Sequence, residues 1–284
     1  SEAQRLPSIS VEQATIKALS DPDPLVRVAA LRALSPSMPP NQRWLRANAL
    51  LSDPVKAVRL EAAVVLADQS VEALSKEDRT RLEVAWAEYE ASQMLNADRP
   101  YGRANLAGFL LRRGEPANAE AEYLAGLRLE PSATPLSVNL ADLYHALGKE
   151  AESEKVLREA IALSPDAAAA HHALGLSLIR QKRYLEATSE LNRATELAPG
   201  ESRFAYVYVV ALNSLDRAQD ARAALDKALR RFPFDLQLLQ LELQDALQAQ
   251  DAKRAAAVAR TLAELAPDDA EIARLAASLE KLRR

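Results

Sequence analysis

The stretch SVNLADLYHALGKEAESEKVLREAIALSP, residues 137–165, decides how the rest of the sequence is interpreted. It ends on a proline, and prolines recur every 34 residues on both sides of it. A period kept through five units without insertion or deletion indicates a protein built from stacked structural repeats. The prolines that set this period are Pro131, Pro165, Pro199, Pro233 and Pro267.

Small and large apolar residues fall in fixed columns within each unit. One column holds Leu106, Leu140 and Leu174, and the next position holds small residues. Small residues let two helices approach closely, while large ones fill the space between neighbours. We therefore predict an all-α solenoid of antiparallel helix pairs, with about fifteen helices. The small residues expected to be nearly fully buried at helix crossings are Ala107, Ala119, Ala141, Gly175, Ala187 and Ala221.

These columns resemble the tetratricopeptide repeat over about residues 100–267, and the stretch quoted above fits that family best. The fifth unit departs from the pattern, with Glu242 where leucine is expected. Residues 268–284 resemble the family's capping helix, which needs one polar face because no unit follows it. The family's tryptophan is missing throughout, and its column holds Arg103, Ser137, His171, Ala205 and Leu239.

A different repeat precedes these units. The segments DPDPLVRVAALRAL, residues 21–34, and DPVKAVRLEAAVVL, residues 53–66, match at an offset of 32. An Asp-Pro pair suits a helix start, because Asp accepts free backbone amides and Pro loses no hydrogen bond there. The pattern resembles HEAT repeats over roughly residues 8–70. We expect Arg27 or Arg59, which share a column, to pair with the repeat's neighbouring aspartate, Asp53 or Asp21.

One long helix over about residues 76–96 is expected to join the two repeat types. Ser75 and Asp78 form a start that resembles a capping box, and Pro100 forbids continuation of the helix. No Gly/Ser-rich linker intervenes, so we expect one continuous body. Its apolar stripe is Leu82, Trp86, Tyr89 and Met94. The predicted parts are HEAT-like repeats (1–75), a bridging helix (76–99), five tetratricopeptide units (100–267) and a C-terminal capping helix (268–284).

Composition excludes several classes of function. The formal net charge is −4 and neither half of the chain is basic, which argues against a surface that binds nucleic acid. No apolar run approaches the roughly 20 residues that span a bilayer, so membrane insertion is not expected. The sequence holds no cysteine, which excludes disulfides and thiol chemistry.

Residues suited to catalysis or metal binding are scarce. His171 and His172 are adjacent, so they point to different faces of a helix and cannot readily share a metal ion. No phosphate-binding glycine loop or catalytic serine or zinc motif appears. The acidic run around Glu150, Glu152 and Glu154 is interpreted as a solvated helix face. We predict a chain that is not an enzyme and that holds no cofactor or metal.

The resemblance to tetratricopeptide repeats implies that the first helix of each unit lines a concave groove. That groove would bind an extended segment or a helix of a partner protein, so we predict a protein-interaction scaffold. Tyr206 and Arg180 are the favoured anchors, because binding sites concentrate energy in aromatic and Arg side chains. The predicted groove residues are Tyr101, Arg112, Asp142, His145, His172, Leu176, Ile179, Arg180, Tyr206 and Asn213.

Two alternatives remain open at this point. The order of the repeats, with phrases such as VNLADLY and DPVKAVRLEAA, resembles the C-terminal half of some bacterial multihaem c-type cytochrome proteins. That resemblance implies a periplasmic or extracytoplasmic parent whose electron-transfer module lies outside this sequence, because no Cys-x-x-Cys-His motif is present. The other alternative is the substrate-recognition arm of a transferase.

Overall fold

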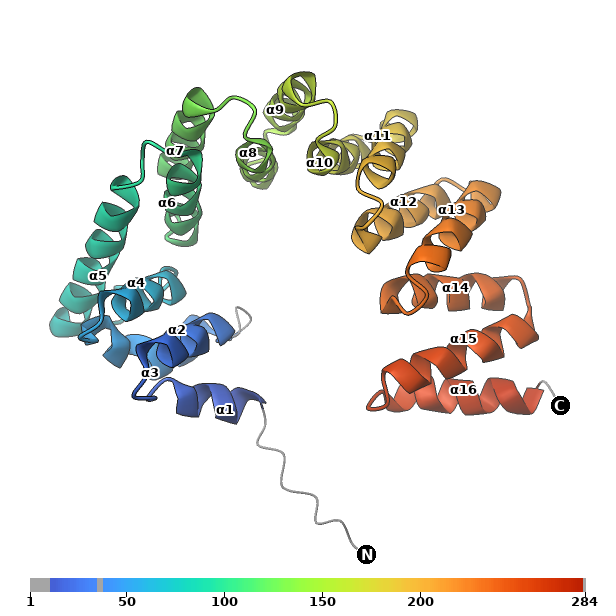
Figure 1. The fold of residues 1–284 in the computed structure, drawn as a ribbon, viewed down its shortest axis with the longest axis horizontal. Helices are drawn as coiled ribbons and strands as arrows, with labels where there is room; N and C mark the ends of the chain where they lie inside the picture. Colours follow the sequence, from blue (N-terminus) through green and yellow to red (C-terminus); the bar gives the residue numbers. More distant parts are fainter. Residues whose placement is uncertain (1–10, 35–37, 283–284) are drawn as a thin grey trace, which may run out of the picture. The chain divides into compact units, whose positions relative to one another are not determined.

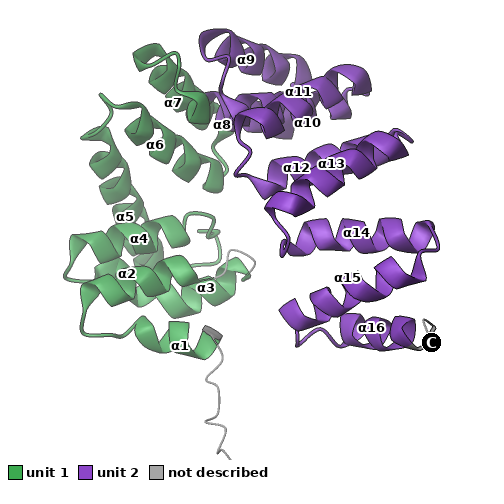
Figure 2. Cartoon of the chain, turned by 45° about the vertical axis from the view of Figure 1, so that its right-hand side comes forward, with its two compact units in different colours: residues 1–136 green, residues 137–284 purple. Residues whose placement is uncertain are grey.

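The structure, a computed structural model, describes residues 11–34 and 38–282. These residues form sixteen α-helices and one short 3-10 helix, η1, and contain no β-strand (Figure 1). The prediction of an all-α solenoid of helix pairs is confirmed. The chain divides into two compact units, Ser1–Leu136 and Ser137–Arg284 (Figure 2).

The first unit contains the Asp-Pro repeats, one long helix and one helix pair. Helix α2 packs on α4 and α4 packs on α5, and the side chains of Leu31, Val58 and Leu82 are fully buried between them. Its elements are α1 (Val11–Ala18), α2 (Pro24–Ala33), α3 (Pro40–Ala47), η1 (Asn48–Ser52), α4 (Lys56–Val65), α5 (Lys76–Met94), α6 (Pro100–Arg112) and α7 (Pro116–Leu129).

The predicted joining helix is α5. The Ser75 hydroxyl accepts a hydrogen bond from the Asp78 amide at 3.1 Å, which confirms the expected start. Leu82 and Trp86 of its apolar stripe are buried, as predicted. Met94, the last residue of α5, is 50% exposed, so the buried part of the stripe does not extend to the end of the helix.

The two arginines in the shared column of the Asp-Pro repeats make the same backbone contacts but bind different carboxylates. Arg27 binds both carboxylate oxygens of Asp53, at 2.8 and 3.0 Å, which confirms the expected pair between repeats. Arg59 does not bind Asp21; it binds Glu88 of α5, at 2.7 and 2.8 Å. Each arginine also donates to the two carbonyls of its own Asp-Pro pair. These guanidinium groups are therefore occupied by structural bonds.

The second unit consists of successive helix pairs and a final helix. Neighbouring helices along the chain pack on one another, as Figure 1 shows for α9 through α16. Its elements are α8 (Thr134–Ala146, which begins just before the boundary of the unit), α9 (Glu150–Leu163), α10 (Ala168–Arg180), α11 (Tyr184–Leu197), α12 (Ser202–Ser214), α13 (Ala218–Arg231), α14 (Leu236–Gln248), α15 (Ala252–Leu265) and α16 (Ala270–Leu282).

The small-residue columns lie at the helix crossings. Gly175 shows why size matters, because an added Cβ would lie 2.7 Å from the Leu191 side chain of α11. That is closer than carbon atoms approach without a clash, so the pair α10–α11 requires a residue without a side chain here. The six residues predicted to be nearly fully buried are all buried: Ala107, Ala119, Ala141, Gly175, Ala187 and Ala221.

The turn inside each 34-residue unit has one backbone geometry, which the sequence analysis did not anticipate. Its central residue has a positive φ, and the two amides that end the turn bond to carbonyls three and five residues back. This is the Schellman arrangement that ends many helices, and it favours glycine. Glycine occurs in only the first two turns; the five residues are Gly114, Gly148, Lys182, Asp216 and Gln250.

The departure at Glu242 is accommodated by charge. Its carboxylate is buried and lies 3.5 Å from Arg222 of α13 and 3.3 Å from Arg254 of α15. Asp245, one turn further along α14, also pairs with both arginines. A cluster of two acids and two arginines thus replaces the apolar contact that a leucine would make. Helix α16 packs on α15 through Leu279, as a final helix was expected to do.

Candidate functional site

The predicted groove residues lie on α6 in the first unit and on α8, α10 and α12 in the second. On α6, Tyr101 is 50% exposed and its hydroxyl lies 3.2 Å from Arg99 Nη1. Arg112, at the other end of α6, is exposed and lies within 3.5 Å of the Val65 carbonyl oxygen. Both side chains remain accessible, one at each end of the helix.

A charged cluster connects α8 and α10 through Glu150, the first residue of α9. Its carboxylate contacts His145 Nδ1, accepts a hydrogen bond from Ser177 at 3.4 Å and lies 3.4 Å from Arg180 Nε. Burial would raise the pKa of Glu150, but hydrogen bonding to His145 and the charge of Arg180 hold it below its usual value. Arg180 and His145 are therefore partly engaged within the chain, which weakens Arg180 as an independent anchor.

Asp142 lies one turn before His145 and faces the same cluster. The protein atoms around Asp142 raise the pKa of its carboxyl, against the lowering effect of Arg180 and His145. No residue in the described part of the chain donates a hydrogen bond to its exposed carboxylate. This carboxylate is free to accept a bond from a ligand.

His172 is not part of an accessible surface. The sequence analysis placed it on the groove, but its side chain is buried, at 8% exposure, and stacks on the Phe204 ring at 4.4 Å. Burial and the nearby charge of Arg203 lower its pKa to about 4. His172 is therefore a neutral packing residue between α10 and α12.

The remaining groove residues combine apolar surface with hydrogen-bonding groups. Leu176 and Ile179 of α10 and Tyr206 of α12 are partly buried, whereas Asn213 at the end of α12 is exposed. Within residues 11–34 and 38–282, neither the Tyr206 hydroxyl nor the Asn213 side chain has a hydrogen-bond partner. Helices α8, α10 and α12, taken together, thus present unpaired polar groups beside partly exposed apolar ones.

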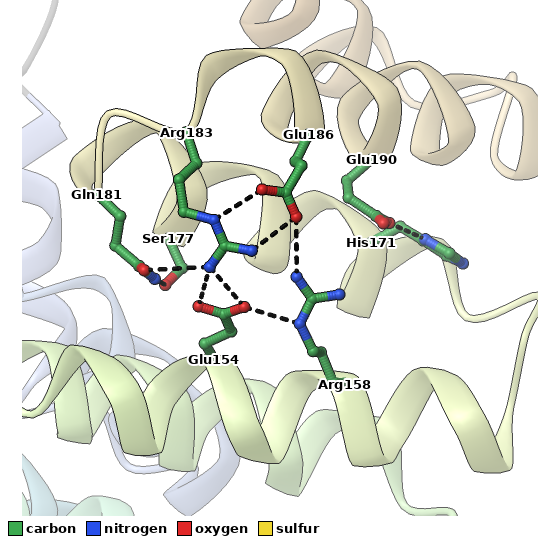
Figure 3. Close-up of polar contacts among 8 residues, drawn as sticks. All are labelled: Glu154, Arg158, His171, Ser177, Gln181, Arg183, Glu186 and Glu190. Atoms are coloured by element: carbon green, nitrogen blue, oxygen red, sulfur yellow. Dashed lines mark hydrogen bonds and ion pairs between the residues drawn. The ribbon is translucent and has the colours of Figure 1, made fainter.

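The second helices α9 and α11 differ, because their charges bind one another. Arg183 lies between Glu154 of α9, at 2.7 Å, and Glu186 of α11, at 2.6 Å, and Arg158 contacts both carboxylates (Figure 3). Burial would raise the pKa of Glu154, but bonds from Arg158, Gln181 and Arg183 lower it. The interpretation of this acidic run as a solvated face was wrong for Glu154, since Arg183, which precedes α11, and Arg158 of α9 bind its carboxylate.

A cavity of about 630 Å³, which was not predicted from the sequence, is lined by α11, α12 and α13. Its walls combine apolar and cationic side chains. A signal in the sequence was available, because the fourth 34-residue unit holds alanine in two columns where most of the other units hold larger residues. The lining includes Ala205, Tyr208, Ala224, Lys227, Arg231 and Phe232.

Two geometric tests bear on other classes of site. In the part of the chain that the structure describes, no three His, Asp or Glu residues converge as metal ligands would. None of the described helices combines the length and apolar character needed to cross a membrane.

Comparisons with known proteins agree with this architecture. The family described as Tetratricopeptide repeat matches residues 109–168, 138–202 and 172–235 in overlapping segments, so this part of the chain carries tetratricopeptide repeats. A search of curated proteins found no match.

Solved structures share the fold at low sequence identity. A double mutant of MamA from strain RS-1 is 22% identical, with a TM-score of 0.50, over 60% of this chain and 96% of that one. PilF of Pseudomonas aeruginosa is 19% identical, with a TM-score of 0.50; the match covers 78% of this chain and 99% of PilF. A chain of the Cut9–Hcn1 hetero-tetramer of the APC/C is 16% identical, with a TM-score of 0.50; the match covers 95% of this chain and 52% of that one.

Proposed function

We propose that this chain is a non-catalytic protein-interaction scaffold, and that α8, α10 and α12 bind a segment of a partner protein. One observation carries the proposal: α8 and α12 present polar groups that the described residues leave unpaired and α10 presents apolar surface, whereas the charges of α9 and α11 bind one another. Unpaired donors and acceptors beside apolar surface are what an incoming peptide requires.

The proposed contacts follow from the positions of these groups. Tyr206 supplies an aromatic surface with a hydroxyl, and Leu176 and Ile179 supply apolar area. Asp142 and Asn213 offer an acceptor and an amide to the backbone of a bound peptide. His172 is left out because it is buried, and Arg180 acts mainly by holding Glu150.

We further propose the arrangement in which this site is set. Residues 1–75 form HEAT-like repeats in this proposal, of which residues 1–10 and 35–37 lie outside the described residues; the duplicated backbone contacts of Arg27 and Arg59 support it. Residues 76–99 form the bridging helix and residues 100–267 form five tetratricopeptide units, supported by the five left-handed turns. Residues 268–284 form the capping helix. No specific observation favours the cytochrome or transferase alternatives.

The test is a peptide display selection on the full chain, followed by calorimetry with the enriched peptides. Replacing Tyr206 and Asn213 together with alanine should weaken binding at least about tenfold, because an interface anchor contributes about 2 kcal/mol. The matched control replaces Tyr184 and Leu185, two exposed residues of the second helix α11, with alanine. Helical circular dichroism verifies that both variants fold. Equal weakening by the two variants, or enrichment of peptides that bind neither α8, α10 nor α12, contradicts the proposal.

A further inference from the structure

The cavity along α13 exists because two facing positions of the fourth unit are alanines. In two of the 34-residue units, positions 19 residues apart, one on the first helix and one on the second, contact each other. In the first 34-residue unit, Arg103 donates to Glu122 at 2.7 Å. In the third 34-residue unit, His171 Nδ1 lies 2.6 Å from the Glu190 carboxylate.

The same side chains also reach a backbone carbonyl six residues earlier. Arg103 Nε donates to the Ala97 oxygen at 2.9 Å, and His171 Nε2 lies 3.0 Å from the Pro165 oxygen. In the fourth unit, the pair is Ala205 and Ala224, and neither side chain has a donor or acceptor. The volume of a ring and its carboxylate partner is therefore missing, and Ala205, Ala224 and Pro199 line the cavity that results.

The cavity has the size and composition of a binding pocket. Its volume of about 630 Å³ lies within the usual range for ligand sites. Tyr208 and Phe232 add aromatic walls, and both pack on the apolar core of the unit. Burial raises the pKa of Tyr208, so its hydroxyl stays a neutral donor. The floor is apolar and fits an aromatic ring.

The rim is cationic although the whole chain is acidic. Four cationic and two acidic side chains line the cavity, against a formal net charge of −4 for the protein. Arg217 pairs with Asp220 at 2.7 Å. Lys227, Arg230 and Arg231 have no ion-pair partner among the residues that the structure describes, and all three are exposed. The lining therefore carries a formal net charge of +2 beside an apolar pocket, which complements an anionic ligand.

The length of the lining favours a polypeptide over a compact anion. The lining runs along α13 from its N-cap Arg217 to its C-cap Phe232, a distance of about 23 Å at 1.5 Å per residue. A single carboxylate or headgroup reaches only one end of that length, whereas about seven extended residues span it. Phe234, two residues past Phe232, is 68% exposed and adds apolar surface next to this lining in the sequence.

We propose that this cavity binds an acidic segment of a partner protein, with one aromatic side chain inserted against Ala205 and Ala224. The carboxylates that flank the aromatic residue face Lys227, Arg230 and Arg231. This site is lined by α11, α12 and α13, and its lining includes none of the residues of the proposed contacts on α8, α10 and α12.

The test uses a fluorescein-labelled peptide of about seven residues, a central tryptophan flanked by aspartates, and fluorescence anisotropy on the full chain. Micromolar binding is expected. Ala205→His with Ala224→Glu, which installs the pair of the third unit, should weaken it at least about tenfold. Ala205→Leu with Ala224→Val, which installs the pair of the fifth 34-residue unit, should weaken binding by a similar factor. Circular dichroism checks that each variant folds, so if one misfolds the other still provides the test.

Charge is tested separately. Lys227→Glu with Arg231→Glu should weaken binding about tenfold, whereas Lys253→Glu with Arg260→Glu makes the same charge change on α15 and should have little effect. Tyr206→Ala with Asn213→Ala should leave this peptide's affinity unchanged, which separates the two proposals. Absence of binding up to millimolar peptide, equal binding to the filled variants, or binding of dodecanoate instead of the peptide would overturn the proposal.

Discussion

The Asp-Pro repeats of the first unit and the 34-residue units of the second align their helices by different means. In the Asp-Pro repeats, one guanidinium group holds α2 to the start of the next repeat through Asp53, with side-chain exposures of 12% and 5%. In the second unit, Ala141, Gly175 and Ala187 set the distance between helices by their small volume. The difference indicates that ionic geometry fixes one region and steric fit fixes the other, so different perturbations should break them.

The largest expected effect is on the ionic region. Arg27→Ala leaves Asp53 buried without its partner, and a broken buried pair costs about 3–5 kcal/mol. Hydrogen exchange measured by mass spectrometry should show loss of protection in α2 and α4. Arg32→Ala is the control, because Arg32 pairs with Glu61 while largely exposed, and a surface pair contributes below about 1 kcal/mol. Unchanged protection in α2 and α4 would show that Arg27 does not align them.

Acidification should separate the two regions. The pKa of His172 is lowered to about 4, below the value near ~6.5 of an unfolded histidine, so the unfolded chain binds more protons between these values. Stability around α10 and α12 should therefore fall as pH drops from about 6.5 to 4, by at most about 3 kcal/mol. Burial would raise the pKa of Asp53, but Arg27 and the Val55 amide lower it, so α2 and α4 should weaken only at more acidic pH.

This pH dependence can be measured by hydrogen exchange at pH 7 and pH 5, corrected for intrinsic rates. Protection of α10 and α12 should decrease at the lower pH, while α2 and α4 keep theirs. His172→Asn removes the titrating group and should remove most of the difference. An equal pH response in His172→Asn would assign the effect to other groups, such as the Glu150 cluster.

A smaller effect is expected from overpacking the steric region. Ala187 is fully buried on α11, and Ala187→Leu should cost about 1–3 kcal/mol because the added atoms have no space. Ala162→Leu, at an exposed position of α9, is the matched control and should leave the melting temperature nearly unchanged. A melting temperature of Ala187→Leu equal to that of the parent would refute a steric basis for this alignment.

The smallest effect concerns the left-handed turns. Lys182 holds a φ of 61°, which is unfavourable for a residue with a side chain, so Lys182→Gly should stabilise the chain by up to about 1 kcal/mol. Gly148→Ala places a methyl group at a φ of 71° and should destabilise it by about the same amount. Urea unfolding midpoints measure both. Destabilisation by Lys182→Gly would mean that the lysine side chain contributes more than the turn geometry costs.

The sequence predicted those features that repeat. The spacing of the prolines predicted the helix pairs, and the shared column predicted the bond from Arg27 to Asp53. It could not predict that Arg59 binds Glu88, because that contact depends on how α5 follows the Asp-Pro repeats. The left-handed turns were missed because only two of the five contain glycine.

The candidate site was predicted less well, for a physical reason. The position of a residue in the repeat predicts the helix face on which it lies, but not whether a side chain of the next helix covers it. Phe204 covers His172, and Arg183 covers Glu154, so both residues differ from their interpretation in the sequence. The cavity beside Ala205 was not predicted, because a single alanine in a helix carries no signal unless the facing column is also small.

The pattern of helix contacts also has a consequence for how the chain folds. In the second unit, the main contacts join helices that are consecutive or next but one in the sequence. Such low contact order implies fast folding, because little chain entropy is lost before each contact forms. Any helix pair with its Schellman turn can nucleate, and its neighbours then add in either direction. The second unit should therefore assemble progressively as it leaves the ribosome, without waiting for the C-terminal helix α16.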